Sequence, residues 1–211
     1  MRSTGQRLKR RWIGGLGVLA VLITLVVGPH HAPASVEEQR KRLPPPAQEC
    51  ADPVAGIWLG HELLRNRWYR FSLFIERVTP GEPELEGHIE SHSWDGGPEQ
   101  SSPPPCVDDD HTEFIVDMPA TGRFENNHIE FTGQSWTLRQ NICRSLTGIY
   151  YPDGFSGDLI EHGTEFHSLS DDGFNPVVPV VFRRIKCEEL DRPVPELPPP
   201  RRPSVGGCGC F

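Results

Sequence analysis

The segment Thr121–Trp136 reads TGRFENNHIEFTGQSW, and its pattern decides the fold that we expect for the whole chain. Two short alternating runs flank Asn126-Asn127, and asparagine tolerates the positive φ angles of a two-residue hairpin turn. Side chains of a β-ladder alternate with a period of two, so one face of this hairpin is apolar and the other charged. The register pairs Glu125 with His128, Phe124 with Ile129, Arg123 with Glu130 and Gly122 with Phe131.

The composition of the chain favours an all-β fold. Its 211 residues include 22 Pro and 21 Gly, which limits long helices. Short runs rich in Val, Ile, Phe, Tyr and Trp recur between turn clusters, and no long apolar run with a helical period follows position 44. The net charge of −8 does not suit a nucleic acid partner, because phosphate binding needs clustered Lys and Arg.

Residues 1–34 have the pattern of an export signal. Basic residues come first, then the apolar run Trp12–Val27, then Ala32-Pro33-Ala34 as a cleavage motif. We expect cleavage after Ala34. The alternative is an uncleaved single-pass anchor, since the apolar run has a length between those of a signal core and a membrane span. Either outcome places the domain outside the cytoplasm, in the periplasm, at the cell surface or secreted, with membrane contact only through this segment.

The rest of the chain divides by composition into three parts. Residues 35–49, SVEEQRKRLPPPAQE, are charged and Pro-rich, which predicts an extended spacer. Residues 50–187 form the expected β-domain. Residues 188–211 form a Pro-rich tail that ends CGCF and is expected to be disordered. Cys208 stands where a prenylation box has its cysteine, but Gly209 and Cys210 do not fit that motif, so a thiol role is expected.

Within residues 50–187 the alternation predicts nine or ten strands, the density of a small barrel or sandwich. Pro179 is expected at an edge, a bulge or a strand start, because it cannot donate to a ladder. Trp68 and Phe74 face away from the core side of their strand, so a loop, a terminus or a partner is expected to cover them. Besides the two strands of the hairpin, the expected strands are 55–64, 67–78, 85–94, 112–118, 136–142, 145–151, 155–162 and 177–186.

The pattern Gly56-x-Trp58-x-Gly60, together with a closing strand Val180–Arg184 (VVFRR), resembles the lipocalin-like barrels of the calycin group. The resemblance implies an antiparallel up-and-down barrel in which Trp58 closes one end. It also implies that Arg183 or Arg184 lies on the Trp58 ring. The chain has no recognisable helix after the last strand, which leaves a β-sandwich as the alternative fold.

A barrel of this kind would place the inward face of strand 67–78 in its interior. These side chains either fill the core or line a cavity for an apolar ligand. The candidate ligand-binding residues are Trp58, Tyr69, Phe71, Leu73 and Ile75.

No metal site, cofactor or catalytic residue is expected. His88 and His92 flank Glu90 on one strand, but their backbones lie about 13 Å apart, too far for one zinc ion. The acidic run 108–110, with Glu99 nearby, lacks the spacing of a calcium loop. No G-x-S-x-G elbow marks a nucleophilic serine.

The cysteine positions predict two disulfides. Cys50 precedes the first expected strand and Cys187 follows the last, which favours the pair Cys50–Cys187 and leaves Cys106–Cys143 as the other pair within the domain. We therefore expect an exported, non-catalytic binding or envelope-associated module, with a small apolar ligand or an envelope protein as partner. The rival hypothesis is a barrel enzyme that acts on a small apolar or carbonyl substrate with His and Glu residues at its mouth.

Overall fold

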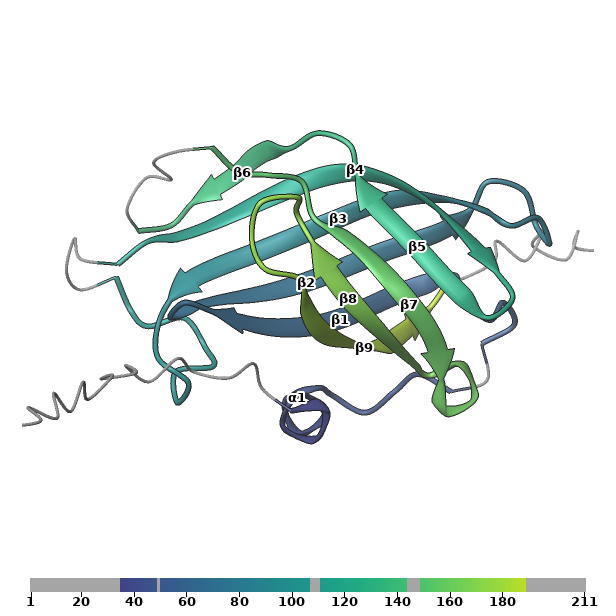
Figure 1. Cartoon of the computed structure of the whole chain (residues 1–211), viewed down its shortest axis with the longest axis horizontal. Helices are drawn as coiled ribbons and strands as arrows, with labels where there is room; N and C mark the ends of the chain where they lie inside the picture. The colour runs from purple at the N-terminus through teal and green to yellow at the C-terminus, as the bar shows by residue number, and fades with distance from the viewer. Residues whose placement is uncertain (1–34, 49, 107–110, 144–148, 189–211) are drawn as a thin grey trace, which may run out of the picture. The chain divides into compact units, whose positions relative to one another are not determined.

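The computed structural model describes residues 35–48, 50–106, 111–143 and 149–188 (Figure 1). The expected export signal and the tail with Cys208 and Cys210 lie outside these ranges. A helix α1 (Val36–Arg42) and a 3₁₀ turn η1 (Glu161–Gly163) accompany the strands, and no described helix has the length and apolarity to cross a membrane. The described strands are β1 (Gly56–Leu64), β2 (Arg67–Arg77), β3 (Glu84–Asp95), β4 (Glu113–Glu125), β5 (His128–Gly133), β6 (Thr137–Asn141), β7 (Gly154–Ile160), β8 (Glu165–Asp171) and β9 (Val178–Cys187).

Eight of these strands close an antiparallel barrel in the order β1-β2-β3-β4-β5-β7-β8-β9, and β9 pairs back with β1 (Figure 1). The ninth, β6, lies outside the ring and pairs with the first part of β4, whereas β5 pairs with the last part of β4. The predicted all-β antiparallel barrel is confirmed, and closure of the ring excludes the β-sandwich.

The hairpin predicted from the Asn126-Asn127 turn has the expected register at all four residue pairs. Both asparagines have positive φ angles, 52° and 67°. A Cβ atom on Gly122 would lie 2.0 Å from the backbone oxygen of Glu130 and 2.9 Å from the ring of Phe131. Only glycine therefore fits beneath Phe131 on the core side of this hairpin.

The barrel interior is packed with aromatic rings. Phe155 lies 4.8 Å from Phe182 and 4.9 Å from Phe71 between ring centroids, and Phe166 lies 5.5 Å from Phe182. A Cβ atom on Gly60 would come within 2.7 Å of the Phe182 ring, so this glycine makes room for the ring. The fully buried residues of this core include Trp58, Phe71, Leu73, Ile75, Leu85, Ile89, Phe114, Val116, Met118, Ile129, Phe131, Phe155, Phe166, Val180 and Phe182.

Trp58 closes one end of the barrel. Its indole N–H donates to the backbone oxygen of Val54 at 2.8 Å, and the Arg184 guanidinium lies 5.2 Å from the centre of its ring. Arg184 also donates to the backbone oxygen of Asp52 at 2.7 Å. Of the two arginines that the resemblance suggested, Arg184 therefore contacts Trp58, whereas Arg183 pairs with Glu165 at 2.6 Å.

The predicted strand boundaries were wrong at three places. β8 was missed because its inward side chains include Ser168 and Ser170, so the run lacks apolar alternation. β4 is one strand through Pro119, which lies between the stretches that pair with β6 and β5. Of the expected strand 145–151, the described residues 149–151 are not in a strand, and the remainder lies outside the described ranges. Pro179 is the second residue of β9, at a strand start as expected.

Part of the expected spacer is helical, so the prediction of extended chain was wrong for α1. Ser35 and Glu38 form a capping box: the Glu38 amide donates to the Ser35 hydroxyl, and the Ser35 amide donates to the Glu38 carboxylate. The predicted spacer was based on composition, which overlooks this local motif. Figure 1 shows α1 beside the barrel, and Gln39 is its buried contact.

Gln39 completes the hydrogen bonding of β9 where β1 stops pairing with it. The β1–β9 ladder ends at Gly60 opposite Phe182. Beyond that point, the Gln39 side chain donates to the backbone oxygen of Pro179 at 3.0 Å and accepts from the Val181 amide at 2.7 Å. One side-chain amide thus takes the place of a strand residue at the seam of the barrel.

Replacing Gln39 with alanine should destabilise the barrel by about 1–3 kcal/mol, because the buried Val181 amide loses its acceptor. The expected signs are a lower urea midpoint and faster hydrogen exchange at Val181. Glu37→Ala is the matched control, since Glu37 is exposed on the same helix and pairs with Lys41 at the surface. A loss of the same size in both variants would show that α1 contributes through helix formation rather than through this seam contact.

Trp68 is covered by other parts of the chain on the face away from the core, as expected. The Trp68 indole donates to the backbone oxygen of Gly97 at 2.8 Å, and Arg42 lies 4.6 Å from its ring centre. Trp94 stacks beside it, with ring centroids 6.3 Å apart. The chain after β3 and the end of α1 therefore bury these two tryptophans on the outer face of the sheet.

Candidate functional site

The end of the barrel opposite Trp58 has a polar interior. The strand register places Glu62 of β1 opposite Tyr69 of β2, and Tyr69 opposite Ser93 of β3. Glu62 and Ser93 are both buried, with 8% and 0% of their surface exposed. Ser93 and Ser168 also have buried hydroxyl groups with no hydrogen-bond partner among the described residues. Buried polar groups normally have a hydrogen-bond partner, so these unpaired hydroxyl groups distinguish this end of the barrel from the apolar core.

Asp153 and Tyr150 belong to the chain between β6 and β7, and they cover part of this end of the barrel. The Tyr150 hydroxyl donates to the Asp153 carboxylate at 2.6 Å. The backbone oxygen of Asp153 accepts from the Gly133 amide at 2.9 Å, which fixes this residue against the end of β5. Asp153 is 6% exposed. A second buried carboxyl group therefore lies at the same end of the barrel as Glu62, and this end is the mouth of the barrel.

Burial controls the ionisation of this pair. Desolvation, with a further contribution from the charge of Asp153, raises the pKa of Glu62 to about 8. Desolvation and the charge of Asp172 raise the pKa of Asp153 to about 7, although the Tyr150 hydrogen bond opposes this. Among the described residues, no salt bridge joins either carboxyl group to a basic side chain. Two carboxyl groups thus stay partly protonated near neutral pH.

Asp172 adds an ionised carboxylate to the same mouth. Burial acts to raise its pKa, but hydrogen bonds from Asn175 and Phe174 outweigh this and lower the pKa. The amides of Phe174 and Asn175 donate to it at 2.9 and 2.6 Å. This Asx turn holds the carboxylate over the opening with its charge intact.

Two adjoining hollows lie at the mouth, and they share Tyr69, Asp153, Asp172 and Asn175. The inner one, about 20 Å³, reaches Glu62 and Phe71. The outer one, about 200 Å³, is lined mainly by aromatic and acidic side chains. Its lining residues are Arg67, Tyr69, Phe114, Ile149, Tyr150, Tyr151, Asp153, Asp172, Phe174 and Asn175.

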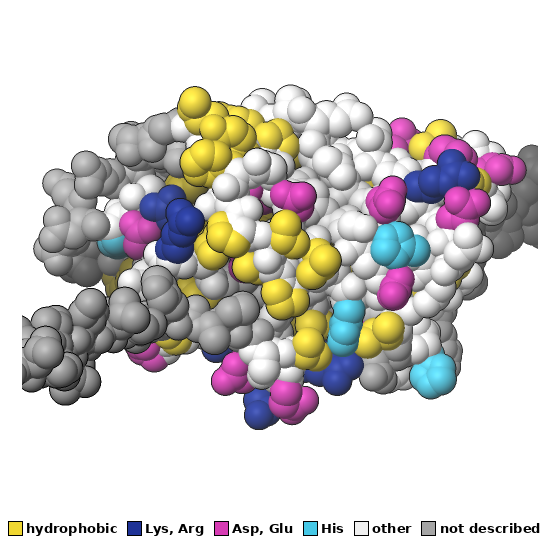
Figure 2. All heavy atoms as spheres, in the orientation of Figure 1, with side chains coloured by type: hydrophobic (Ala, Val, Ile, Leu, Met, Phe, Trp, Pro, Cys, Tyr) yellow, Lys and Arg dark blue, Asp and Glu magenta, His cyan; other side chains and the backbone are white. Residues whose placement is uncertain are grey.

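The surface around the outer hollow is apolar. Ile149 and Phe174 are 76% and 68% exposed, and the Tyr151 ring stacks on Phe174 with centroids 5.0 Å apart. Figure 2 shows hydrophobic side chains gathered over the β6 side of the barrel, with acidic side chains among them. The mouth therefore combines apolar surface with negative charge.

The predicted ligand-binding residues do not share one cavity. Tyr69 and Phe71 line the inner hollow. Leu73 and Ile75 are buried in the core, and Trp58 closes the other end. Phe71, Leu73 and Ile75 thus belong to the core, and Tyr69 and Phe71 reach the mouth, so that ligand binding by these residues stays a prediction.

Sequence reasoning missed the acidic residues of the mouth. Glu62 had a usable signal, because it has the same strand parity as Trp58 and Gly60 and so had to point inward. The composition of Asp153-Gly154 and of Asp171-Asp172-Gly173 is typical of turns, and in the structure these residues lie at strand ends, where Gly154 begins β7 and Asp171 ends β8. Nothing in their local sequence indicated that two of these aspartates would meet at one opening.

Comparison with protein-family models, with curated proteins and with solved structures found no match. A function is therefore inferred from the side chains of the mouth. A ligand that carries positive charge would supply the counter-charge that Glu62 and Asp153 lack among the described residues. The aromatic rings beside them offer apolar contact and π faces to the same ligand.

Proposed function

We propose that this protein is an exported, non-catalytic binding module, akin to the lipocalin-like barrels, that takes a small amine with an apolar group at its mouth. The observation that carries the proposal is the pair of buried carboxyl groups, Glu62 and Asp153, without a basic partner among the described residues. A location outside the cytoplasm is compatible with the two intramolecular disulfides.

The proposed binding mode couples charge and apolar contact. An ammonium group near Glu62 and Asp153 would favour their ionised forms, so binding would release protons. The rings of Tyr69 and Tyr150 would contact the apolar part of the ligand. The net charge of −8 would attract cations from a distance. Because aromatic side chains fill the interior, the ligand is placed at the mouth rather than inside the barrel.

The same pair of carboxyl groups favours a second candidate, an enzyme. A carboxyl group with a pKa of about 8, like that of Glu62, suits general acid–base chemistry near neutral pH. The residues that line the two hollows supply Glu62 but no histidine, unlike the barrel enzyme expected as the rival hypothesis. Chemical change of the ligand during a binding experiment would favour the enzyme.

Phenethylamine should bind the purified protein with an affinity that rises between pH 6 and pH 8.5, as measured by isothermal titration calorimetry. The rise is expected because the ammonium group needs the ionised carboxylates. The heat should depend on the ionisation enthalpy of the buffer, which reports proton release. Asp153→Asn should weaken binding at least about tenfold, the equivalent of about 1.4 kcal/mol.

Asp158→Asn is the matched control, because Asp158 is an exposed aspartate of β7 that pairs with His128 away from the mouth. It should leave the affinity unchanged. 2-Phenylethanol, the neutral analogue, should bind much more weakly than the amine. Equal binding of the alcohol, or saturable binding of the anionic probe anilinonaphthalene sulfonate in place of the amine, would contradict a cation site and favour an apolar ligand.

A further inference from the structure

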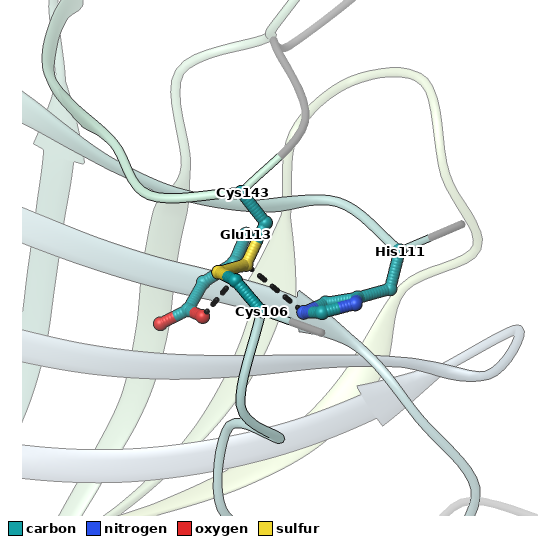
Figure 3. Close-up of side chains that lie close together, drawn as sticks. All are labelled: Cys106, His111, Glu113 and Cys143. Carbon is teal, nitrogen blue, oxygen red and sulfur yellow. Dashed lines mark hydrogen bonds between the residues drawn. A yellow bond between two sulfur atoms is a disulfide. The ribbon is translucent and has the colours of Figure 1, made fainter. Parts of the chain in front are cut away.

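A second cluster of chemically active side chains lies outside the barrel, at the start of β4. Figure 3 shows His111 and Glu113 directed at the Cys106–Cys143 disulfide from different sides. His111 Nε2 lies 3.0 Å from Cys143 Sγ, and Glu113 Oε2 lies 3.5 Å from the same sulfur. One ligand atom from each of the four residues lies within 4.8 Å of the others. We propose that reduction of this disulfide creates a Cys₂-His-Glu site for a zinc-like divalent metal ion.

Backbone hydrogen bonds fix the segments that carry these ligands. The backbone oxygen of Glu113 accepts from the amides of Ile142 and Cys143, at 2.9 and 3.3 Å, which holds Cys143 beside β4. The amide of Thr112, the residue after His111, donates to the Asp95 carboxylate at 2.8 Å. His111 and Cys143 therefore start from positions that do not depend on the disulfide alone.

Glu113 is oriented by two further residues on the outer face. Arg70 can only donate, so its contact of 2.9 Å with Nδ1 of His92 makes that nitrogen an acceptor. The proton of neutral His92 then lies on Nε2, which donates to Glu113 Oε1 at 2.8 Å. Glu113 is 5% exposed and turns its other oxygen, Oε2, toward the sulfurs. A metal-binding carboxylate is commonly held by such a donor.

The disulfide and metal-bound forms exclude each other. In a tetrahedral zinc site with Zn–S bonds of about 2.3 Å, the two sulfurs stand about 3.8 Å apart, farther than a disulfide bond permits. A dithiol reductant gives two electrons to the Cys106–Cys143 bond and is itself oxidised to a disulfide, leaving two thiols. Metal binding then displaces one proton from each thiol, while neutral His111 and ionised Glu113 complete the ligand set. The metal would thus bind only to the reduced protein.

The test uses the full chain with Cys208→Ser and Cys210→Ser, so that thiols of the tail do not add ligands. The protein is reduced with dithiothreitol, desalted under nitrogen and titrated with Co²⁺ and then Zn²⁺. One equivalent of Co²⁺ should give the absorption of a tetrahedral thiolate complex, and Zn²⁺ should displace it with release of about two protons. The oxidised protein should bind Zn²⁺ at least about a thousandfold more weakly.

Variants distinguish metal binding at this site from metal binding by free thiols elsewhere in the chain. Cys106→Ser with Cys143→Ser keeps Cys50 and Cys187 available under the same reducing conditions and should show no tetrahedral spectrum. His111→Ala and Glu113→Gln should each weaken Zn²⁺ binding about 10-fold to 100-fold. An unfolded reduced chain would bind through its thiols without regard to His111 or Glu113. Metal binding that is insensitive to both substitutions, or that survives loss of Cys106 and Cys143, would overturn the proposal.

Discussion

Replacing Cys50 and Cys187 together with alanine should lower the free energy of unfolding by about 5 kcal/mol, as measured by urea denaturation. The disulfide links residues 137 positions apart, with Cα atoms 5.3 Å from each other. In the chain-entropy model, a loop of this length restricts the unfolded chain by about 5 kcal/mol. Cys187 also pairs with Gly56 where β9 meets β1, so the bond holds the first and last strands of the ring together.

Cys106→Ala with Cys143→Ala is the matched control, because it removes a disulfide that spans only 37 positions. The same model gives about 4 kcal/mol for that loop. Hydrogen exchange should separate the two variants more sharply: loss of Cys50–Cys187 should expose amides of β1 and β9, and loss of Cys106–Cys143 should not. A decrease below about 1 kcal/mol for the first variant would mean that α1 and the β1–β9 ladder hold the seam without it.

The parts of the fold that follow from alternation could be predicted. The hairpin register and the closed antiparallel barrel follow from the period-two pattern. The Cys50–Cys187 pair follows from the positions that flank the outer strands, and Cys106–Cys143 is the pair that then remains in the domain. Trp58 and its arginine partner were expected from the family resemblance, and Arg184 occupies that place. These features were accessible because each depends on local residues or on the order of strands.

The parts that sequence reasoning missed depend on polar side chains inside the barrel. β8 has serines at inward positions, so it does not read as an amphipathic strand. Gln39 of α1 acts as a strand residue for β9 at a sequence distance of 142 positions, which no local pattern predicts. Glu62 and Asp153 share a mouth only because the ring closes. Buried polar groups contradict the binary pattern, and such contradictions are common at functional sites.

Glu62→Gln should become more stable relative to the wild type as the pH rises from 5 to 8.5, by an amount on the order of 3 kcal/mol. Burial raises the pKa of Glu62 from 4.5 to about 8. Between these values the folded protein keeps a proton that the unfolded chain releases. This contribution to stability is complete below pH 4.5 and is lost as the pH rises through 8. Glutamine does not titrate, so the variant avoids that loss. Urea denaturation at each pH gives the difference.

His61 changes the stability with pH in the direction opposite to Glu62, and the comparison of Glu62→Gln with the wild type cancels this contribution. Burial and the charges of Arg70 and Arg42 lower the pKa of His61 from 6.5 to about 4, so His61 costs stability as the pH falls below 6.5. The variant retains His61, and the difference between the two proteins isolates Glu62. Glu86→Gln, at an exposed position of β3, is the matched control for the loss of a carboxyl group at the surface. A flat difference for Glu62→Gln would mean that this carboxyl group ionises without penalty, which would remove the electrostatic basis of the proposed amine site.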